Sequence, residues 1–207
     1  MTLARRSFLQ AGLGLGVAGA ALSIAPLAWA DADVIGDILA RTSPPAGAYL
    51  PESLAGASAR RLAFDNLHTG EKLDVAYWEN GAYVPSALAA VNYVLRDHRS
   101  NEVHYIEPRL LDLLTALSHQ LEAGPNYEVI SGYRSPQTNA MLHAQSSEVA
   151  VGSLHQYGMA IDIRMAGLDI WRLRDAALSL DRGGVGYYPE SEFVHVDVGR
   201  VRHWGGT

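Results

Sequence analysis

The sequence predicts an α+β domain with a small, mainly antiparallel sheet and flanking helices. Two alternating segments on either side of a glycine-containing turn predict a β-hairpin, and two leucine-rich segments with helical spacing follow it. Short segments near the C-terminus alternate apolar and polar residues, which predicts further strands. Strands and helices interleave along the chain, but the hairpin and the short C-terminal strands favour antiparallel pairing.

The hairpin and two helices are the first predicted elements. Residues 61–68 and 72–78 are the hairpin strands, because a short turn that contains Gly70 joins them. Residues 83–98 and 107–121 carry leucines and valines three and four positions apart, so each segment predicts an amphipathic helix.

The later elements are shorter. Gly124 and Pro125 end the second helix. The patterns that follow predict strands at 127–130, 159–165 and 193–198 and helices at 137–145 and 168–180.

The composition excludes several classes of function. A chain of 207 residues is long enough for one domain with a sizeable core. Its 16 lysines and arginines against 22 acidic residues argue against a nucleic-acid partner, because such binding requires clustered positive charge. The chain has no cysteine, so a metal ion would be held by His, Asp or Glu.

The first thirty residues predict an export signal. The pair Arg5-Arg6 precedes an apolar stretch at residues 11–25, and Ala28 and Ala30 form a small-x-small cleavage site. This pattern is typical of a twin-arginine signal, which implies the twin-arginine translocation machinery as a partner and a periplasmic location after cleavage behind Ala30. The alternative is a single membrane anchor, since the apolar stretch is nearly long enough to span a bilayer. We expect no stable anchor.

Three regions follow from these patterns. Residues 1–30 are the signal, residues 31–60 are a segment rich in Pro, Ala and Ser without a helical or strand period, and residues 61–207 are the folded domain.

Two segments that alternate in apolar residues each place one candidate metal ligand, an aspartate or a histidine, on the face opposite the apolar side chains. Asp162 faces away from its isoleucine neighbours, and His195 faces away from valines. If the two strands are neighbours, these side chains form a cross-strand pair about 5 Å apart at Cβ, and His155 can reach them from a loop. Two imidazoles and one carboxylate suit Zn²⁺ and leave a fourth position open. The alternative is a hydrogen-bonded histidine and a salt-bridged aspartate.

The order of motifs resembles a known family. The residues that carry the resemblance are Ser131-Gly132-Tyr133-Arg134-Ser135, then Ser153, His155 and Asp162, then residues 183–189 and 193–204. They are similar to the zinc D-alanyl-D-alanine peptidases of the lysostaphin and sonic-hedgehog clan, and in particular to exported murein endopeptidases of the MepK type. The resemblance runs from about Arg61 to Trp204 and implies the hedgehog-like peptidase fold.

The resemblance implies roles for particular residues. The zinc ligands fall on His155, Asp162 and His195. Arg134 would hold the substrate carbonyl and the oxyanion that develops on it, although it could instead bridge loop carboxylates. Ser153 matches a substrate-contacting position and could equally be a turn or cap hydroxyl.

Tyr133, beside Arg134 in the same motif, is a further candidate for substrate binding.

The general base has three candidates. Glu192 lies three residues before the last ligand, as the base does in related carboxypeptidases and dipeptidases. Strict alternation would place it on the face opposite His195, so it can serve only if the chain bends at Ser191 or Glu192. His203 and Asp197 are the other candidates, and Asp197 can instead orient a ligand imidazole.

The function implied is a zinc metallopeptidase that cleaves amide bonds in the peptide crosslinks of peptidoglycan, acting as a monomer. One alternative is a D,D- or L,D-carboxypeptidase or dipeptidase that trims stem peptides. Another is a wall-binding domain with a structural zinc and no turnover.

Overall fold

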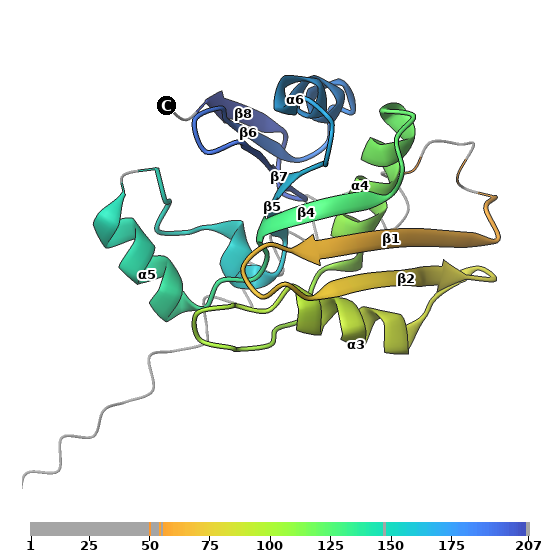
Figure 1. Cartoon of the computed structure of the whole chain (residues 1–207), viewed down its shortest axis with the longest axis horizontal. Coiled ribbons are helices and arrows are strands. Elements are labelled where there is room, and N and C mark those ends of the chain that lie inside the picture. Colours follow the sequence, from red (N-terminus) through yellow and green to blue (C-terminus); the bar gives the residue numbers. More distant parts are fainter. Residues whose placement is uncertain (1–49, 51–53, 55, 147, 206–207) are drawn as a thin grey trace, which may run out of the picture.

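The computed structural model describes residues 50, 54, 56–146 and 148–205 (Figure 1). Within these residues one sheet of eight strands has the order β3-β2-β1-β4-β5-β7-β6-β8. The strands are β1 (Ala59–Asn66), β2 (Lys72–Glu79), β3 (Ala82–Tyr83), β4 (Asn126–Ser131), β5 (Ala160–Arg164), β6 (Gly184–Tyr188), β7 (Phe193–Asp197) and β8 (Arg202–Gly205).

The helical elements of the described part are α3 (Pro85–Val94), α4 (Pro108–Gln120), α5 (Pro136–Gln145), α6 (Ile170–Ser179) and a short 3-10 turn, η1 (Leu154–Tyr157).

The sheet is mixed. Five of the pairings between described strands are antiparallel, whereas β1 pairs with β4 and β6 pairs with β8 in parallel. The predicted α+β class with a mainly antiparallel sheet is confirmed, and the two parallel pairings are an addition to it. Both parallel pairs join strands that are distant in the sequence, which a local pattern does not reveal.

One face of the sheet is buried under helices. Helix α3 contacts β2, α4 contacts β1, and α6 contacts β6 and β7. Helix α4 is nearly all buried, and it covers the buried side chains of Leu62 and Phe64 on β1 and Tyr127 on β4. The Tyr127 hydroxyl donates a hydrogen bond to the Leu114 carbonyl of this helix. Figure 1 shows α5 standing apart from these helices, at one end of the molecule. The other face of β5 and β7 is therefore left for polar side chains.

A buried ion pair ties the start of the domain to the core. Arg60 lies 3.1 Å from Asp112 of α4 and its guanidinium covers the ring of Trp78 at 4.1 Å. Tyr77 and Tyr83 donate hydrogen bonds to the same carboxylate, so its oxygens are well satisfied. Strand β1 therefore begins at Ala59, two residues before the start predicted for the first hairpin strand.

The predicted elements differ from the observed ones mainly at their ends. The hairpin, the three strands and the four helices are present, but α3 ends at Val94 and not at His98. Strands β3, β6 and β8 are not among the predicted elements. Strand β3 has only two residues, glycines interrupt β6, and β8 is only four residues long. The predicted signal peptide and most of residues 31–60 lie outside the described residues. No helix of the described part is long and apolar enough to cross a membrane.

Candidate metal centre

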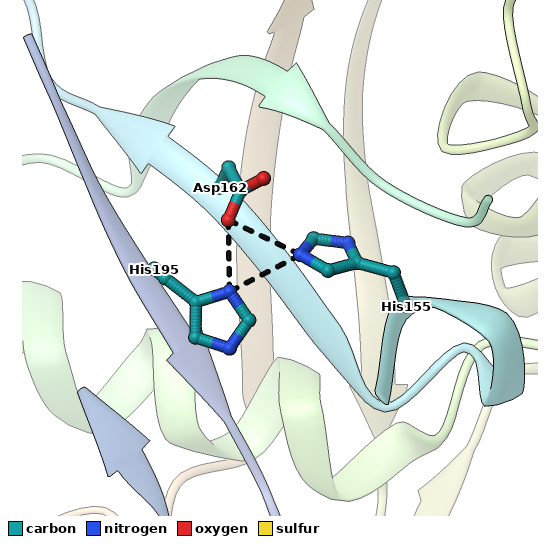
Figure 2. Close-up of side chains that lie close together, drawn as sticks. All are labelled: His155, Asp162 and His195. Atoms are coloured by element: carbon teal, nitrogen blue, oxygen red, sulfur yellow. Dashed lines mark hydrogen bonds and ion pairs between the residues drawn. The ribbon is translucent and has the colours of Figure 1, made fainter. Parts of the chain in front are cut away.

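Three polar side chains converge on the open face of the sheet (Figure 2). Asp162 on β5 is the direct cross-strand partner of His195 on β7, and His155 reaches both from η1. The cross-strand pair predicted from the alternating segments is confirmed. The isoleucines of β5 and the valines of β7 are buried on the opposite face, and their burial fixes this register.

The three side chains meet through one atom each. His155 Nε2 lies 3.1 Å from Asp162 Oδ1 and 3.1 Å from His195 Nδ1. His195 Nδ1 lies 2.8 Å from the same Oδ1 atom. All three residues are buried, so the short distances do not depend on exposed, mobile side chains.

The outer nitrogen of each imidazole is held by an acceptor. His155 Nδ1–H donates to the Gly132 carbonyl at 2.6 Å, and His195 Nε2–H donates to Asp197 Oδ2 at 3.0 Å. In these neutral tautomers the inner nitrogens carry lone pairs. Two lone pairs and a carboxylate oxygen therefore face one another, and this arrangement calls for a cation or a proton between them. The three residues form a possible metal site.

The pKa directions agree with this view. Burial lowers the pKa of His155, which favours its neutral, metal-binding form. Burial also acts to lower the pKa of His195, but hydrogen bonds with Asp162 and Asp197 outweigh that effect and raise it.

Asp197 is engaged on all sides. Its buried carboxylate accepts from His195, from the Arg202 guanidinium at 2.6 and 3.0 Å, and from the backbone N–H groups of Gly184 and Gly199. This geometry suits a carboxylate that orients an imidazole. It does not suit a general base, because the oxygens face β6 and β8 and their lone pairs are already occupied.

The cluster lies at the wall of a hollow of about 400 Å³. The side chains around it come from the loop after β4, from η1 and the loop before it, and from strands β5 to β8. They include Arg134, Glu148, Ser153, Leu154, Asp162, Tyr188, Phe193, His195, Arg202 and Trp204.

Arg134 is mostly buried in the wall of this hollow. Its Nη2 atom lies 3.5 Å from Ser153 Oγ and 3.9 Å from Asp162 Oδ2, and its Nε has no hydrogen-bond partner among the described residues. A buried guanidinium with such long contacts retains donors for another acceptor. Ser153 precedes η1, and its hydroxyl makes no capping hydrogen bond to that turn. Ser153 lines the hollow, where its hydroxyl is available to a bound molecule.

The loop that carries Arg134 is fastened to its surroundings through the backbone. Tyr133 N–H donates to the Leu95 carbonyl, and Arg134 N–H donates to the carbonyl of His155. At Gly132 a Cβ atom would lie 2.4 Å from the Leu95 oxygen, so only glycine fits there. The loop and His155 hold each other in place, because the Gly132 carbonyl accepts from the imidazole in return.

Asp97 anchors the next residue of this loop. Its buried Oδ2 atom accepts from both the N–H and the hydroxyl of Ser135, and its Oδ1 atom accepts from the N–H groups of Arg99 and Ser100. Burial acts to raise the pKa of Asp97, but hydrogen bonds from Thr138 and Ser135 outweigh it and hold the pKa well below its usual range.

Tyr133 does not reach the hollow. Its ring stacks on His104 with centroids 4.5 Å apart, and its hydroxyl donates to Glu102 at 2.8 Å. The structure does not support the predicted role of Tyr133 in substrate binding. Neighbouring side chains of this loop point in different directions, and of Tyr133 and Arg134 only Arg134 lines the hollow.

His203 also lies away from the cluster. On β8 it pairs with buried Val185, while its neighbour Trp204 pairs with Gly186 on the open face. The exposed His203 side chain lines a separate depression with residues of α6. The prediction that the chain returns His203 to the site is wrong, because alternation along β8 gives that face to Trp204.

Glu192 can act as the general base only if the chain bends near it, and this condition is met. The chain bends there, with a φ of 53°, and the side chain lies on the same side of the sheet as Arg164 of β5. Its carboxylate is 72% exposed, pairs with Arg164 at 3.4 Å, and lines a neighbouring depression and not the hollow of the cluster.

The hollow contains residues that the sequence reasoning missed. Tyr188, Trp204 and Glu148 all line it. Tyr188 and Trp204 belong to the strands that local patterns did not predict. Residues 183–189 are part of the family resemblance, but the face that each of their side chains takes depends on the pairing of β6 with β7.

A mixed sheet that presents two imidazoles and a carboxylate beside an open hollow is the arrangement of a metallopeptidase. Comparison with known sequences agrees with this class. Residues 54–204 match the family described as peptidoglycan L,D-endopeptidase MepK.

Named relatives lie in the same family. Peptidoglycan L,D-endopeptidase MepK of Escherichia coli strain K12 is 42% identical over 152 residues, which cover 73% of this chain and 84% of that protein. The probable peptidoglycan L,D-endopeptidase MepK of Haemophilus influenzae is 43% identical over 149 residues, or 72% of this chain and 80% of that protein. The chain belongs to the MepK family of peptidases.

We expect the Asp97→Asn variant to be destabilised by about 2 kcal/mol at pH 7, because hydrogen bonds to a buried charge are lost. The pKa of Asp97 is lower in the folded chain than its ordinary value of 3.8. The stability that it contributes is therefore present above about pH 4 and is lost as the pH falls below that value. Urea unfolding at several pH values should show the difference from wild type shrinking below pH 4.

The matched control is Asp74→Asn, which removes the charge of an exposed ion pair with Arg61. Its effect should stay within about 0.5 kcal/mol. A difference between wild type and Asp97→Asn that does not change with pH would contradict the anchoring role of the charge.

Proposed function

We propose that the chain is a zinc-dependent endopeptidase that hydrolyses amide bonds in the peptide crosslinks of peptidoglycan. The observation that carries the proposal is the convergence of three acceptor atoms, from His155, Asp162 and His195, beside an open hollow. The relatives are named L,D-endopeptidases, which favours a bond between an L-configured and a D-configured centre. Among the crosslinks this is the bond between two diaminopimelate residues.

The three donors fit zinc. Tetrahedral zinc with bonds of about 2.1 Å would place its donor atoms about 3.4 Å apart. The present separations of 2.8 to 3.1 Å need to widen only slightly. Zinc held by these residues would supply Lewis acidity and a hydrolytic nucleophile at neutral pH.

Arg134 serves as the electrostatic partner of the reacting carbonyl. Its guanidinium keeps unused donors inside a buried wall, where a hydrogen bond to a developing negative charge is stronger than in water. Ser153 lies beside it and offers a hydroxyl to the peptide backbone of the substrate.

Glu192 is the proposed proton carrier. It takes a proton from the attacking water and passes it to the leaving amine. An exposed ion pair such as that of Glu192 with Arg164 contributes little free energy, so it opposes reorientation toward the hollow only weakly. Glu148, which lines the hollow, is the competing candidate.

The location proposed is the periplasm. Residues 1–30 act as a twin-arginine signal that is cleaved behind Ala30, and the peptidase domain, which includes β1 from Ala59, is a monomer that meets its substrate outside the cytoplasmic membrane. The family membership supports an exported protein, because its named relatives act on peptidoglycan.

Metal analysis tests the ligand set. The purified chain should bind one zinc ion, and His155→Ala or His195→Ala should lose most of it. His203→Ala is the matched control, because that imidazole lies on the opposite face of the sheet and its loss should leave zinc content and activity unchanged. A His155→Ala protein with full zinc stoichiometry would contradict the assignment.

Digestion of purified sacculi tests the activity. Separation of the released muropeptides should show loss of crosslinked dimers and gain of monomers, first among dimers joined through two diaminopimelate residues. Loss of terminal D-alanine with dimers intact would make the chain a carboxypeptidase. Zinc and murein binding without any cleavage would make it a wall-binding domain.

Two substitutions separate metal binding from catalysis. Glu192→Gln should lower kcat by roughly 10²- to 10⁴-fold, the usual contribution of a general base. Arg134→Ala should lower it by about 10²- to 10³-fold, the usual contribution of an oxyanion donor. Both variants should keep their zinc. Glu190→Gln, at an exposed position in the same turn, is the control and should be fully active. An active Glu192→Gln enzyme would transfer the proton role to Glu148.

A further inference from the structure

The hydroxyl of Tyr188 occupies a position that the proposed mechanism does not use. We propose that Tyr188 is a catalytic residue whose O–H donates a hydrogen bond to the carbonyl oxygen of the scissile amide, as a second donor beside Arg134. Trp204 holds the tyrosine in position. This inference rests on the proposed function and adds a named donor to it.

Tyr188 lies on the same face of the sheet as the metal cluster. In the pairing of β6 with β7, Gly186 is opposite His195 and Tyr188 is opposite Phe193. The Tyr188 and Phe193 rings stack with centroids 4.5 Å apart, and both rings line the hollow. Tyr188 therefore lies on β6 two residues beyond Gly186, the residue that pairs with the proposed ligand His195.

The Tyr188 hydroxyl is oriented by one defined hydrogen bond. Trp204 Nε1–H donates to the Tyr188 oxygen at 2.8 Å. An indole N–H can only donate, so the tyrosine must accept in this bond and its own hydrogen remains to be donated elsewhere. Burial raises the pKa of Tyr188, which keeps the hydroxyl protonated as a donor.

Trp204 connects this hydroxyl to the cluster. Its ring lies against His195, with centroids 5.2 Å apart, and it fills the space above Gly186. A Cβ atom at Gly186 would lie 2.7 Å from the indole ring, so the glycine is what allows the ring to occupy this position. The Trp204 indole therefore packs its ring on the proposed ligand His195 and orients the Tyr188 hydroxyl with its N–H.

The hydroxyl and the Arg134 guanidinium act on one space. Tyr188 and Arg134 both line the hollow, and Trp204, which orients the Tyr188 hydroxyl, lines it with them. A carbonyl oxygen that enters the hollow beside the cluster can therefore meet a charged donor from the Arg134 loop and a neutral donor from β6. Two donors aimed at a developing negative charge are the usual composition of an oxyanion site.

Tyr188→Phe tests the inference with the full chain and a soluble crosslinked muropeptide dimer. We expect kcat to fall about 100-fold, KM to change less than threefold, and zinc content and thermal midpoint to stay near wild type, because a donor to the transition state is lost. Tyr187→Phe is the matched control. Tyr187 faces α6, where Arg174 covers its ring, so its hydroxyl should be dispensable.

A double-mutant cycle tests the role of Trp204 as a positioning residue. Trp204→Phe keeps a ring on His195 but removes the N–H, and we expect kcat to fall about tenfold with KM unchanged. In the Tyr188→Phe background the same change should have almost no effect, because there is no hydroxyl left to orient. A purely structural tryptophan would lower kcat by the same factor in both backgrounds.

Three outcomes would overturn the inference. Tyr188→Phe activity within threefold of wild type would show that the hydroxyl is not needed. A rise in KM alone would assign it to ground-state binding, for example of a free carboxylate. In either case, cleavage by the wild-type chain leaves the proposed function standing without this donor. A wild-type chain that cleaves no crosslink would instead refute the proposed function, and this inference with it.

Discussion

The pairing of β5 with β7 in a single register is the constraint on which the site depends. Successive side chains of a strand point to opposite faces, so a shift of one residue would send His195 to the helix-covered face and bring a valine to the hollow. The isoleucines of β5 and the valines of β7 are almost completely buried, and each contributes about 1.5 to 3 kcal/mol through that burial. The apolar core thus positions two polar residues that take no part in it.

The same register brings three acceptor atoms together, and a cation or a proton between them relieves their repulsion. Asp197 and the Gly132 carbonyl hold the outer protons of the two imidazoles and so turn the inner lone pairs toward Asp162. The groups proposed to act beside this centre differ in exposure. Arg134 is buried, as suits the charge-stabilising role proposed for it, whereas Glu192 is exposed and paired with Arg164, as suits the proton-carrying role proposed for it.

Local patterns predicted most of the fold because they report on burial within one element. The leucines of α4 and the alternation in β1 and β7 could be recognised without knowledge of any partner strand. Strands β6 and β8 were missed because Gly184 and Gly186 weaken the pattern of the first and four residues give too short a period for the second. Their strand character comes from pairing with β7 and with each other.

The sequence by itself determined the chemistry available to the site: no thiolate, two histidines and an aspartate on strand or loop segments, and the faces that Asp162 and His195 present. Only the tertiary structure decided which neighbours join them. Tyr133 turns toward Glu102, His203 faces α6, and Tyr188 enters the hollow in a place that no local pattern marked. Alternation within a strand is set by the backbone of that strand alone, whereas the direction of a loop and the order of strands are set by contacts between residues far apart in the chain.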